Sequence, residues 1–135
     1  MDIQAVKKLD AYFKKLFRSG RIRVVPQDEK TAAVYIGEEK LGDLNVDDED
    51  DDLSYNFRME IRLGEVRDID QLNVLNSYLK RKFDNESIRV VPRAKKRDSL
   101  EAYLGDEFIG VVFVDDEGRQ RVYIFEMPIL DMDLT

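Results

Sequence analysis

Apolar positions follow a helical period at two places, near the N-terminus and just past the middle of the chain. The apolar residues are Ile3, Val6, Leu9, Phe13 and Leu16 or Phe17 in the first segment, and Ile69, Leu72, Leu75, Leu79 and Phe83 in the second. A spacing of three to four residues places these side chains on one face of a helix. Asp2 is expected to cap the first helix, and either Asp68 or Asp70 the second. The pattern predicts two amphipathic helices.

Each predicted helix is followed by four short runs that are typical of β-strands. The runs cover residues 22–25, 32–37, 39–46 and 53–62 after the first helix, and 88–91, 100–105, 107–114 and 121–129 after the second. Turn-like segments at 37–39 and 105–107 suit tight hairpins. A helix followed by an antiparallel meander predicts an α+β fold with the helices packed on antiparallel sheet.

The second half of the chain repeats the first. The run Ile-Arg-Val-Val-Pro at 22–26 recurs unchanged at 88–92, and 22 of the 53 positions compared over residues 3–26 and 33–61 are identical to their counterparts. We therefore predict two tandem αββββ repeats, residues 1–65 and 66–135, related by a pseudo-two-fold axis and fused into one compact domain. The pattern leaves open whether the two sheets join edge to edge or pack face to face.

Composition removes several classes of function. The 135 residues include no cysteine and no histidine, so thiolate nucleophiles, imidazole bases and the usual zinc ligands are all missing. We expect no enzyme activity, no catalytic residue and no cofactor. The formal net charge of -7 disfavours nucleic acid and anionic membranes as partners. With no long apolar run and no signal-peptide core, a soluble, cytoplasmic protein is expected.

Two charged segments raise the question of ligand binding. The acidic run at 47–52 has no glycine at its sixth position, and Arg58 stands where a calcium-binding loop has its bidentate glutamate, so we predict a solvated hairpin tip and no metal site. The basic residues Arg89, Arg93, Lys95, Lys96 and Arg97 cluster in the second repeat only. Because no aromatic residue is interleaved with them, we interpret them as a solvated loop and keep weak nucleic-acid binding as an alternative.

The two repeats differ on one face of the predicted sheet. The face that carries Tyr55, Phe57, Met59 and Ile61 is equally apolar in both repeats, which marks it as the shared core. On the opposite face, Asp43, Asn45, Ser54 and Asn56 of the first repeat become Val111, Phe113, Val122 and Ile124 in the second. We call the last four the four-residue patch. A sheet that is apolar on both faces is expected to be covered on both.

Three covers for the four-residue patch stay open. The first repeat or the C-terminal segment Pro128 to Thr135 folds over it, a second copy of the chain packs on it, or a different protein binds it. The last two make the protein a non-enzymatic protein-interaction module with a protein partner or a homodimer, which is the function we predict. An acidic secretion-type chaperone or adaptor is a second alternative.

Several stretches of the chain carry a family resemblance. They are a Leu-x-x-Tyr helix at Leu75 and Tyr78, the run Ile-Arg-Val-Val-Pro-Arg at 88–93, the segment Ala-Tyr-Leu-Gly-Asp-Glu-Phe-Ile-Gly-Val at 102–111 and the ending at 127–134. In the first repeat, Leu-Ser-Tyr-Asn-Phe at 53–57 looks like the corresponding strand. In these stretches the chain resembles DUF3126, a family of short alphaproteobacterial proteins of unknown function.

The resemblance implies a bacterial cytoplasmic protein, and it offers no assigned activity and no catalytic residues to carry over. It also implies relatives of about one repeat in length. On that basis, this chain would hold covalently what single-copy relatives build as a homodimer.

Overall fold

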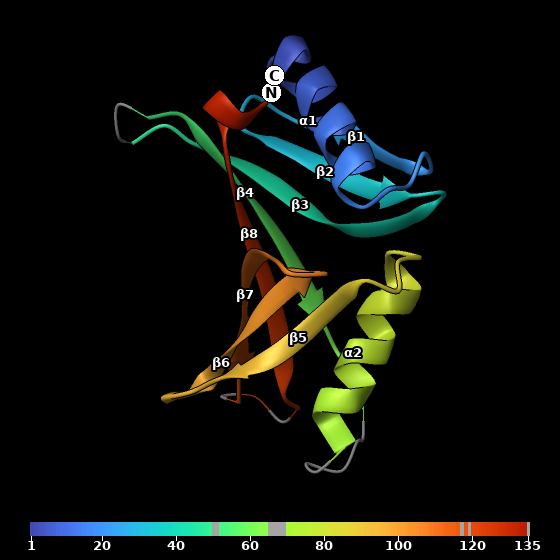
Figure 1. The fold of residues 1–135 in the computed structure, drawn as a ribbon. Helices are drawn as coiled ribbons and strands as arrows, with labels where there is room; N and C mark the ends of the chain where they lie inside the picture. The colour runs from blue at the N-terminus through green and yellow to red at the C-terminus, as the bar shows by residue number, and fades with distance from the viewer. Residues whose placement is uncertain (50–51, 65–69, 117, 119, 135) are drawn as a thin grey trace. The chain divides into compact units, whose positions relative to one another are not determined.

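The computed structural model describes the chain apart from residues 50–51, 65–69, 117, 119 and 135, and apart from the side chains of residues 96 and 97. The element order is α1 (Ile3–Leu16), β1 (Ile22–Pro26), β2 (Thr31–Ile36), β3 (Glu39–Asp47), β4 (Ser54–Ile61), α2 (Gln71–Lys82), β5 (Ile88–Arg93), β6 (Lys96–Leu104), β7 (Glu107–Asp115), β8 (Val122–Leu130) and η2 (Asp131–Asp133) (Figure 1). Each helix is followed by four strands, which confirms the predicted α+β class and the two repeats.

The described strands form one antiparallel sheet in the order β1-β2-β3-β4-β8-β7-β6-β5. Within each repeat, successive strands pair as hairpins, so each repeat is a meander. Because β4 and β8 are neighbours in this order, the two meanders belong to one sheet.

The chain divides into two compact units. Unit 1 contains Met1–Arg58 and Pro128–Thr135, and unit 2 contains Met59–Met127. Both β4 and β8 contribute to both units, so unit 1 takes its last segment from the second repeat. There the amide of Asp131 donates to the carbonyl of Leu53 at 3.0 Å, and the Tyr55 hydroxyl donates to the Asp131 carboxylate at 3.2 Å.

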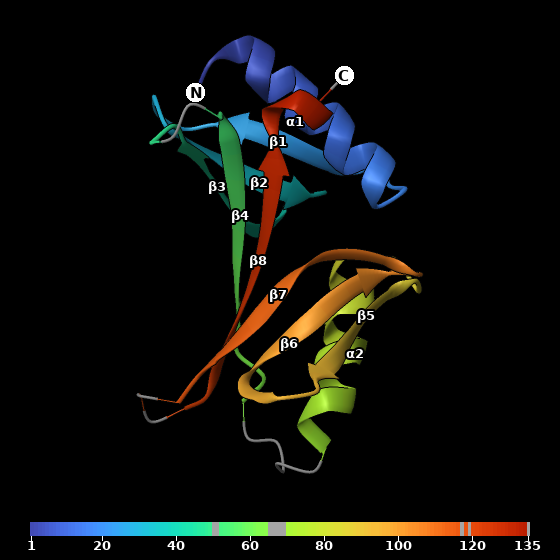
Figure 2. The same ribbon diagram turned by 60° about the vertical axis from the view of Figure 1, so that its left-hand side comes forward.

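Helix α1 supplies the core of unit 1. It runs along β1 and β2 (Figures 1 and 2) and turns the fully buried Leu9 and Phe13 toward the sheet. The ring of Phe13 meets the ring of Phe57 on β4 edge to face, with 5.3 Å between centroids, an arrangement that aromatic pairs favour. At the start of the helix, the Asp2 side chain accepts from the Gln4 amide at 3.2 Å, so the expected N-cap is confirmed.

Helix α2 builds the equivalent core of unit 2 with different side chains. Leu79 stands where α1 has Phe13, and the ring of Phe83 instead meets the ring of Phe125 on β8, with 6.4 Å between centroids. Asp70 occupies the N-cap position but makes no capping hydrogen bond through its side chain. The other expected cap, Asp68, lies outside the described residues.

Two equivalent glycines let the last strand of each meander approach its neighbour closely. A Cβ atom on Gly42 would lie 2.4 Å from the carbonyl oxygen of Arg58 and 3.0 Å from the ring of Phe57. A Cβ atom on Gly110 would lie 2.3 Å from the carbonyl oxygen of Glu126 and 2.9 Å from the ring of Phe125. These distances are too short for any side chain, so both positions require glycine for space.

Equivalent helix side chains bind the outward backbone of the two edge strands. In unit 1, the Val24 amide of β1 donates to the Asp10 carboxylate at 2.9 Å. In unit 2, Asn76 accepts from the Val90 amide of β5 at 2.7 Å and donates to the Val90 carbonyl at 3.1 Å. The Lys80 ammonium donates to the Ile88 carbonyl on the same edge. Edge strands with unpaired backbone invite strand addition, and these contacts oppose it.

We expect Gly42→Ala and Gly110→Ala each to destabilise the protein by about 1–3 kcal/mol, because the added methyl group collides with a backbone carbonyl that cannot move without breaking the sheet. Urea denaturation measures the free energy of unfolding. Gly20→Ala is the control, since a Cβ atom there meets nothing within 4 Å. Equal stability of all three variants would contradict the close approach.

We expect Asn76→Leu to lower the free energy of unfolding by about 1–3 kcal/mol, because it leaves the amide and carbonyl of Val90 without their partner. Asn76→Asp keeps the acceptor for the amide and should cost less. Asn73→Leu, at an exposed position of the same helix, is the control for helix propensity. If Asn76→Leu and Asn73→Leu unfold at the same urea concentration, the proposed edge cap is wrong.

Burial, the charge of Asp131 and the hydrogen bond to it raise the pKa of Tyr55 to about 12. Because the pKa of Tyr55 is higher in the folded chain than in the unfolded chain, the protonated hydroxyl stabilises the fold. This contribution to the free energy of unfolding is complete below pH 10 and is lost as the pH rises toward 12. The ultraviolet absorbance of tyrosinate, recorded for wild type minus Tyr55→Phe, should therefore show a step near pH 12. A difference step near pH 10 would show that Tyr55 is solvated.

Candidate functional site

The structure brings the four-residue patch together on one face of unit 2. This outer face is the side of β5 to β8 opposite the side packed by α2. Phe113 on β7 and Ile124 on β8 are direct cross-strand partners. Phe113 is 42% exposed, and Val111, Val122 and Ile124 are half-buried. Val112, Tyr123 and Phe125, which alternate with them along the two strands, are buried, as expected for an inner face.

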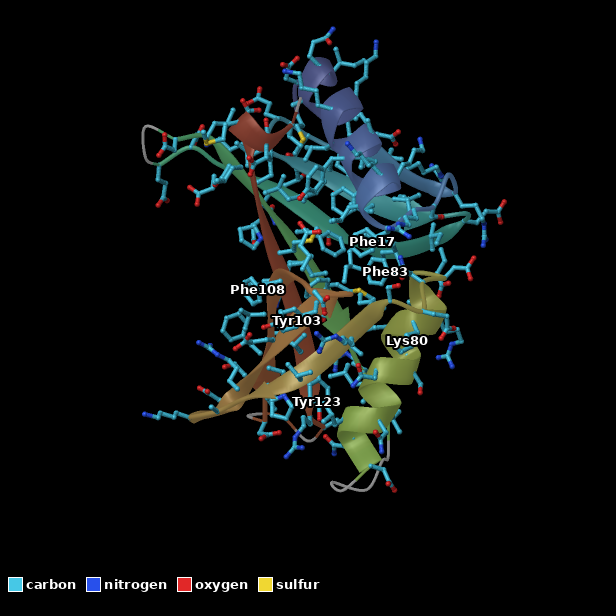
Figure 3. All side chains as sticks on the ribbon, viewed as in Figure 1. Phe17, Lys80, Phe83, Tyr103, Phe108 and Tyr123 are labelled. Atoms are coloured by element: carbon cyan, nitrogen blue, oxygen red, sulfur yellow. The ribbon has the colours of Figure 1, made fainter. Side chains whose placement is uncertain are left out.

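A fifth apolar residue, Phe108, extends the patch. It is 53% exposed, pairs across the strands with Tyr103, and meets the Tyr103 ring edge to face at 5.7 Å between centroids. Figure 3 shows both rings on the side of β6 and β7 away from α2. Its counterpart in the first repeat is Lys40, so Phe108 is a further exchange of a polar residue for an apolar one. We call Phe108 and the four-residue patch together the extended patch.

Sequence reasoning missed Phe108 because of a bulge. Simple alternation from Val111 and Phe113 puts residue 109, and not residue 108, on the outer face. The register between β6 and β7 shifts after Ala102, so that Tyr103 opposes Phe108 while Ala102 opposes Gly110. One extra residue on the bulged strand reverses the alternation beyond it. The aligned repeats did carry a signal for this residue, because the polar Lys40 of the first repeat is equivalent to the apolar Phe108 of the second.

Polar side chains hold the rim of the extended patch in place. The Tyr103 hydroxyl donates to the Glu101 carboxylate at 2.6 Å, and this hydrogen bond raises the pKa of Tyr103. The Arg89 guanidinium lies over the Tyr103 ring, 4.6 Å from its centroid, and donates to the Gly105 carbonyl at 3.0 Å. Tyr103 is thereby fixed from two sides, and the ring of Phe108 rests against it.

The described arginines of the predicted basic cluster make contacts within their own unit. Arg93 donates to the Ser99 hydroxyl at 3.2 Å and lies 4.0 Å from the Glu101 carboxylate, while Arg89 is stacked as above. Lys95 is exposed in the turn after β5. The side chains of Lys96 and Arg97 lie outside the described residues. The two arginines on β5 are thus engaged with neighbours on the outer face.

Unit 1 repeats the polar rim without the apolar patch. The Arg23 guanidinium lies 4.6 Å from the centroid of the Tyr35 ring and donates to the Gly37 carbonyl at 3.2 Å. Where unit 2 has Phe108 and Val111, unit 1 has Lys40 and Asp43, which form a salt bridge at 2.9 Å. The stacked arginine therefore belongs to the shared fold, and the apolar surface is a property of unit 2.

The C-terminal segment, one of the covers considered for the patch, is engaged within unit 1. Its residues 128–134 belong to that unit, where Asp131 bonds to Leu53 and Tyr55 and where Leu134 is buried. Phe108 and Phe113 keep exposed fractions of 53% and 42% in the chain.

A hollow beside α2 in unit 2 is a further feature with convergent polar groups. It has a volume of about 380 Å³ and is lined by Arg62, Leu63, Asn73, Val74, Ser77, Tyr78 and Arg81. Arg62 lies 3.6 Å from the Glu60 carboxylate, and Arg81 lies over the Tyr78 ring at 5.6 Å. Its two cations are engaged locally, so no preformed anion site results. Among the described residues, no three acids gather around a common point, and residues 50 and 51 of the acidic run lie outside them.

Comparison with known proteins gives a family and no activity. Neither a curated protein nor a solved structure matches the chain. In the part of the chain that the structure describes, neither helix has the length and apolar character to cross a bilayer. The bacterial origin implied by the resemblance stays a prediction. The family model described as "Protein of unknown function (DUF3126)" matches twice, at residues 5–63 and 71–133. The chain therefore belongs to the DUF3126 family, with the family's unit present in two tandem copies.

Proposed function

We propose that the protein is a non-enzymatic protein-interaction module and that the extended patch is its binding surface. One observation carries this proposal: at five equivalent positions, polar residues of the first repeat are replaced by apolar residues in the second. All five apolar residues lie on one face of unit 2, and two of them are phenylalanines with large exposed fractions.

The first repeat acts as an internal control for folding. It builds the same helix and four strands with Lys40, Asp43, Asn45, Ser54 and Asn56 at these positions. The fold therefore does not require apolar residues there. Exposed apolar area that folding does not require is characteristic of surfaces that bind other proteins.

The surroundings of the patch favour binding by a rigid surface. The five residues lie on paired strands, and the neighbouring Tyr103 is held by Glu101 and Arg89. A surface that is already ordered loses little conformational entropy when a partner docks. Aromatic residues at the centre and charged residues at the rim match the composition of protein interfaces. An acidic chaperone or adaptor would use the same surface for its client.

A photoreactive benzophenone amino acid placed at position 113 should give a covalent protein adduct in the cells that naturally make this protein. The same group at position 45, the exposed equivalent in the first repeat, should give none. Adding Val111→Asp and Ile124→Asn to the position-113 variant should abolish the adduct, because both changes introduce the polar residues of the first repeat. Gel mobility and mass spectrometry identify the adduct.

The absence of an adduct at position 113 would overturn the proposed function. So would adducts of equal yield at positions 45 and 113, since these would show contact by chance collision.

A further inference from the structure

We infer that the two repeats are binding partners that complete each other by exchanging the ends of their last strands, and that they stay bound when the covalent link between them is cut. The inference does not use the extended patch, so it stands apart from the proposed function. The surfaces involved are those at which each compact unit receives a segment of the other repeat.

The repeat that the sequence defines and the unit that the fold defines end at different places. The family model matches residues 5–63 and 71–133, so one repeat is a helix followed by four whole strands. The compact units instead divide β4 and β8 within the strands. Residues 59–63 of the first repeat belong to unit 2, and residues 128–134 of the second repeat belong to unit 1. We call these two stretches the exchanged segments.

Equivalent side chains carry the exchange in both directions. Ile61 and Ile129 occupy the same position of the two repeats, and both are buried. Ile61 belongs to unit 2 and Ile129 to unit 1, so each unit contains one isoleucine from the other repeat. Met59 adds a second buried side chain to unit 2, and Leu134 adds one to unit 1. Because separation of the repeats would return all four side chains to water, their burial favours association.

Polar contacts fix the segment that unit 1 receives. The Asp131 amide donates to the Leu53 carbonyl at 3.0 Å, and the Tyr55 hydroxyl donates to the Asp131 carboxylate at 3.2 Å. The Leu134 amide donates to the Asp131 carbonyl at 3.0 Å, and this turn ends at the buried Leu134 side chain. The first two hydrogen bonds join one repeat to the other, so this exchanged segment is held by specific contacts as well as by burial.

The segment that unit 2 receives lies beside α2 and beside the hairpin of β7 and β8. Arg62 and Leu63 line the hollow next to α2 together with Tyr78. Arg62 also lines a second hollow with Asp115 at the end of β7 and Val122 at the start of β8. The end of β4 is therefore surrounded by elements of the second repeat.

Reciprocal exchange makes each repeat depend on the other. Domains of about 60 residues are marginally stable, because they bury a small fraction of their surface. Each repeat here would also lack the exchanged segment that completes its unit. The two repeats are therefore expected to fold together, and the covalent link adds a high effective concentration of one repeat near the other.

The first experiment cuts the folded full chain between the repeats. A specific protease site is inserted after the exposed Gly64, and the purified protein is cleaved there. In light scattering, the cleaved protein should keep the mass of the uncut protein, and its circular dichroism spectrum should be unchanged. Its Tm should fall on dilution more steeply than that of the uncut protein, because two separate polypeptides now associate as they fold.

Two substitutions in the segment that unit 1 receives form a matched pair. Leu134→Asp places a charge at a buried position, whereas Met132→Asp places one at a position that is 77% exposed. In the cleaved protein, Leu134→Asp should raise the Kd between the repeats about tenfold or more, because the new carboxylate loses its water. Met132→Asp should change the Kd by less than about threefold. Sedimentation velocity over a dilution series measures the Kd.

The uncut forms of both variants show whether the substitution acts on association. Both should stay folded by circular dichroism, because the link keeps the repeats together. If uncut Leu134→Asp does not fold, Leu134→Ala replaces it and should raise the Kd by a smaller factor.

Repeats that separate at micromolar concentration after cleavage would overturn the inference, whether or not they stay folded. Equal Kd values for the variants at positions 134 and 132 would overturn it as well, since the repeats would then be held by other contacts. The adduct at position 113 tests the proposed function separately, so failure of one leaves the other standing.

Discussion

The packing of each helix on one face of its own meander is the contact on which the rest of the structure depends. It buries Phe13 against Phe57 in unit 1 and Phe83 against Phe125 in unit 2, and so decides which face of the sheet is core. The same helices carry Asp10 and Asn76, whose side chains bind the backbone of the edge strands. One helix therefore closes one face and one edge of each unit.

Comparison of the two repeats distinguishes residues that the fold requires from residues that it does not require. Residues that both repeats share, such as the glycines that make room for an aromatic ring, are required by the fold in each. Residues that differ on the outer face are not required by it, because the first repeat folds with polar side chains there. The second repeat has apolar residues at five positions of that face where the first has polar ones. Random substitution would not be expected to concentrate these differences on one face of the sheet.

Much of the fold could be predicted because the sequence obeys local rules. Period and turn residues gave the two helices and eight strands to within a few positions, and the common apolar face of β4 and β8 gave the core. The N-cap at Asp2 followed from the same rules. Asp70 did not, because a capping hydrogen bond depends on backbone and side-chain geometry that residue type leaves undetermined. Strand order across the sheet was also out of reach, since pairing between distant strands leaves no periodic signal.

By itself, the sequence determined the duplication, the element order and four of the five residues of the extended patch, because each rests on identity at a fixed shift or on strict alternation. Tertiary structure decided the rest. The bulge between β6 and β7 moved Phe108 onto the outer face, and one extra residue is enough to reverse a two-residue period. It also placed Arg89 and Glu126 on opposite sides of the patch, and engaged Arg93 with Ser99. These relations join residues far apart in the chain, so only the folded backbone brings them together.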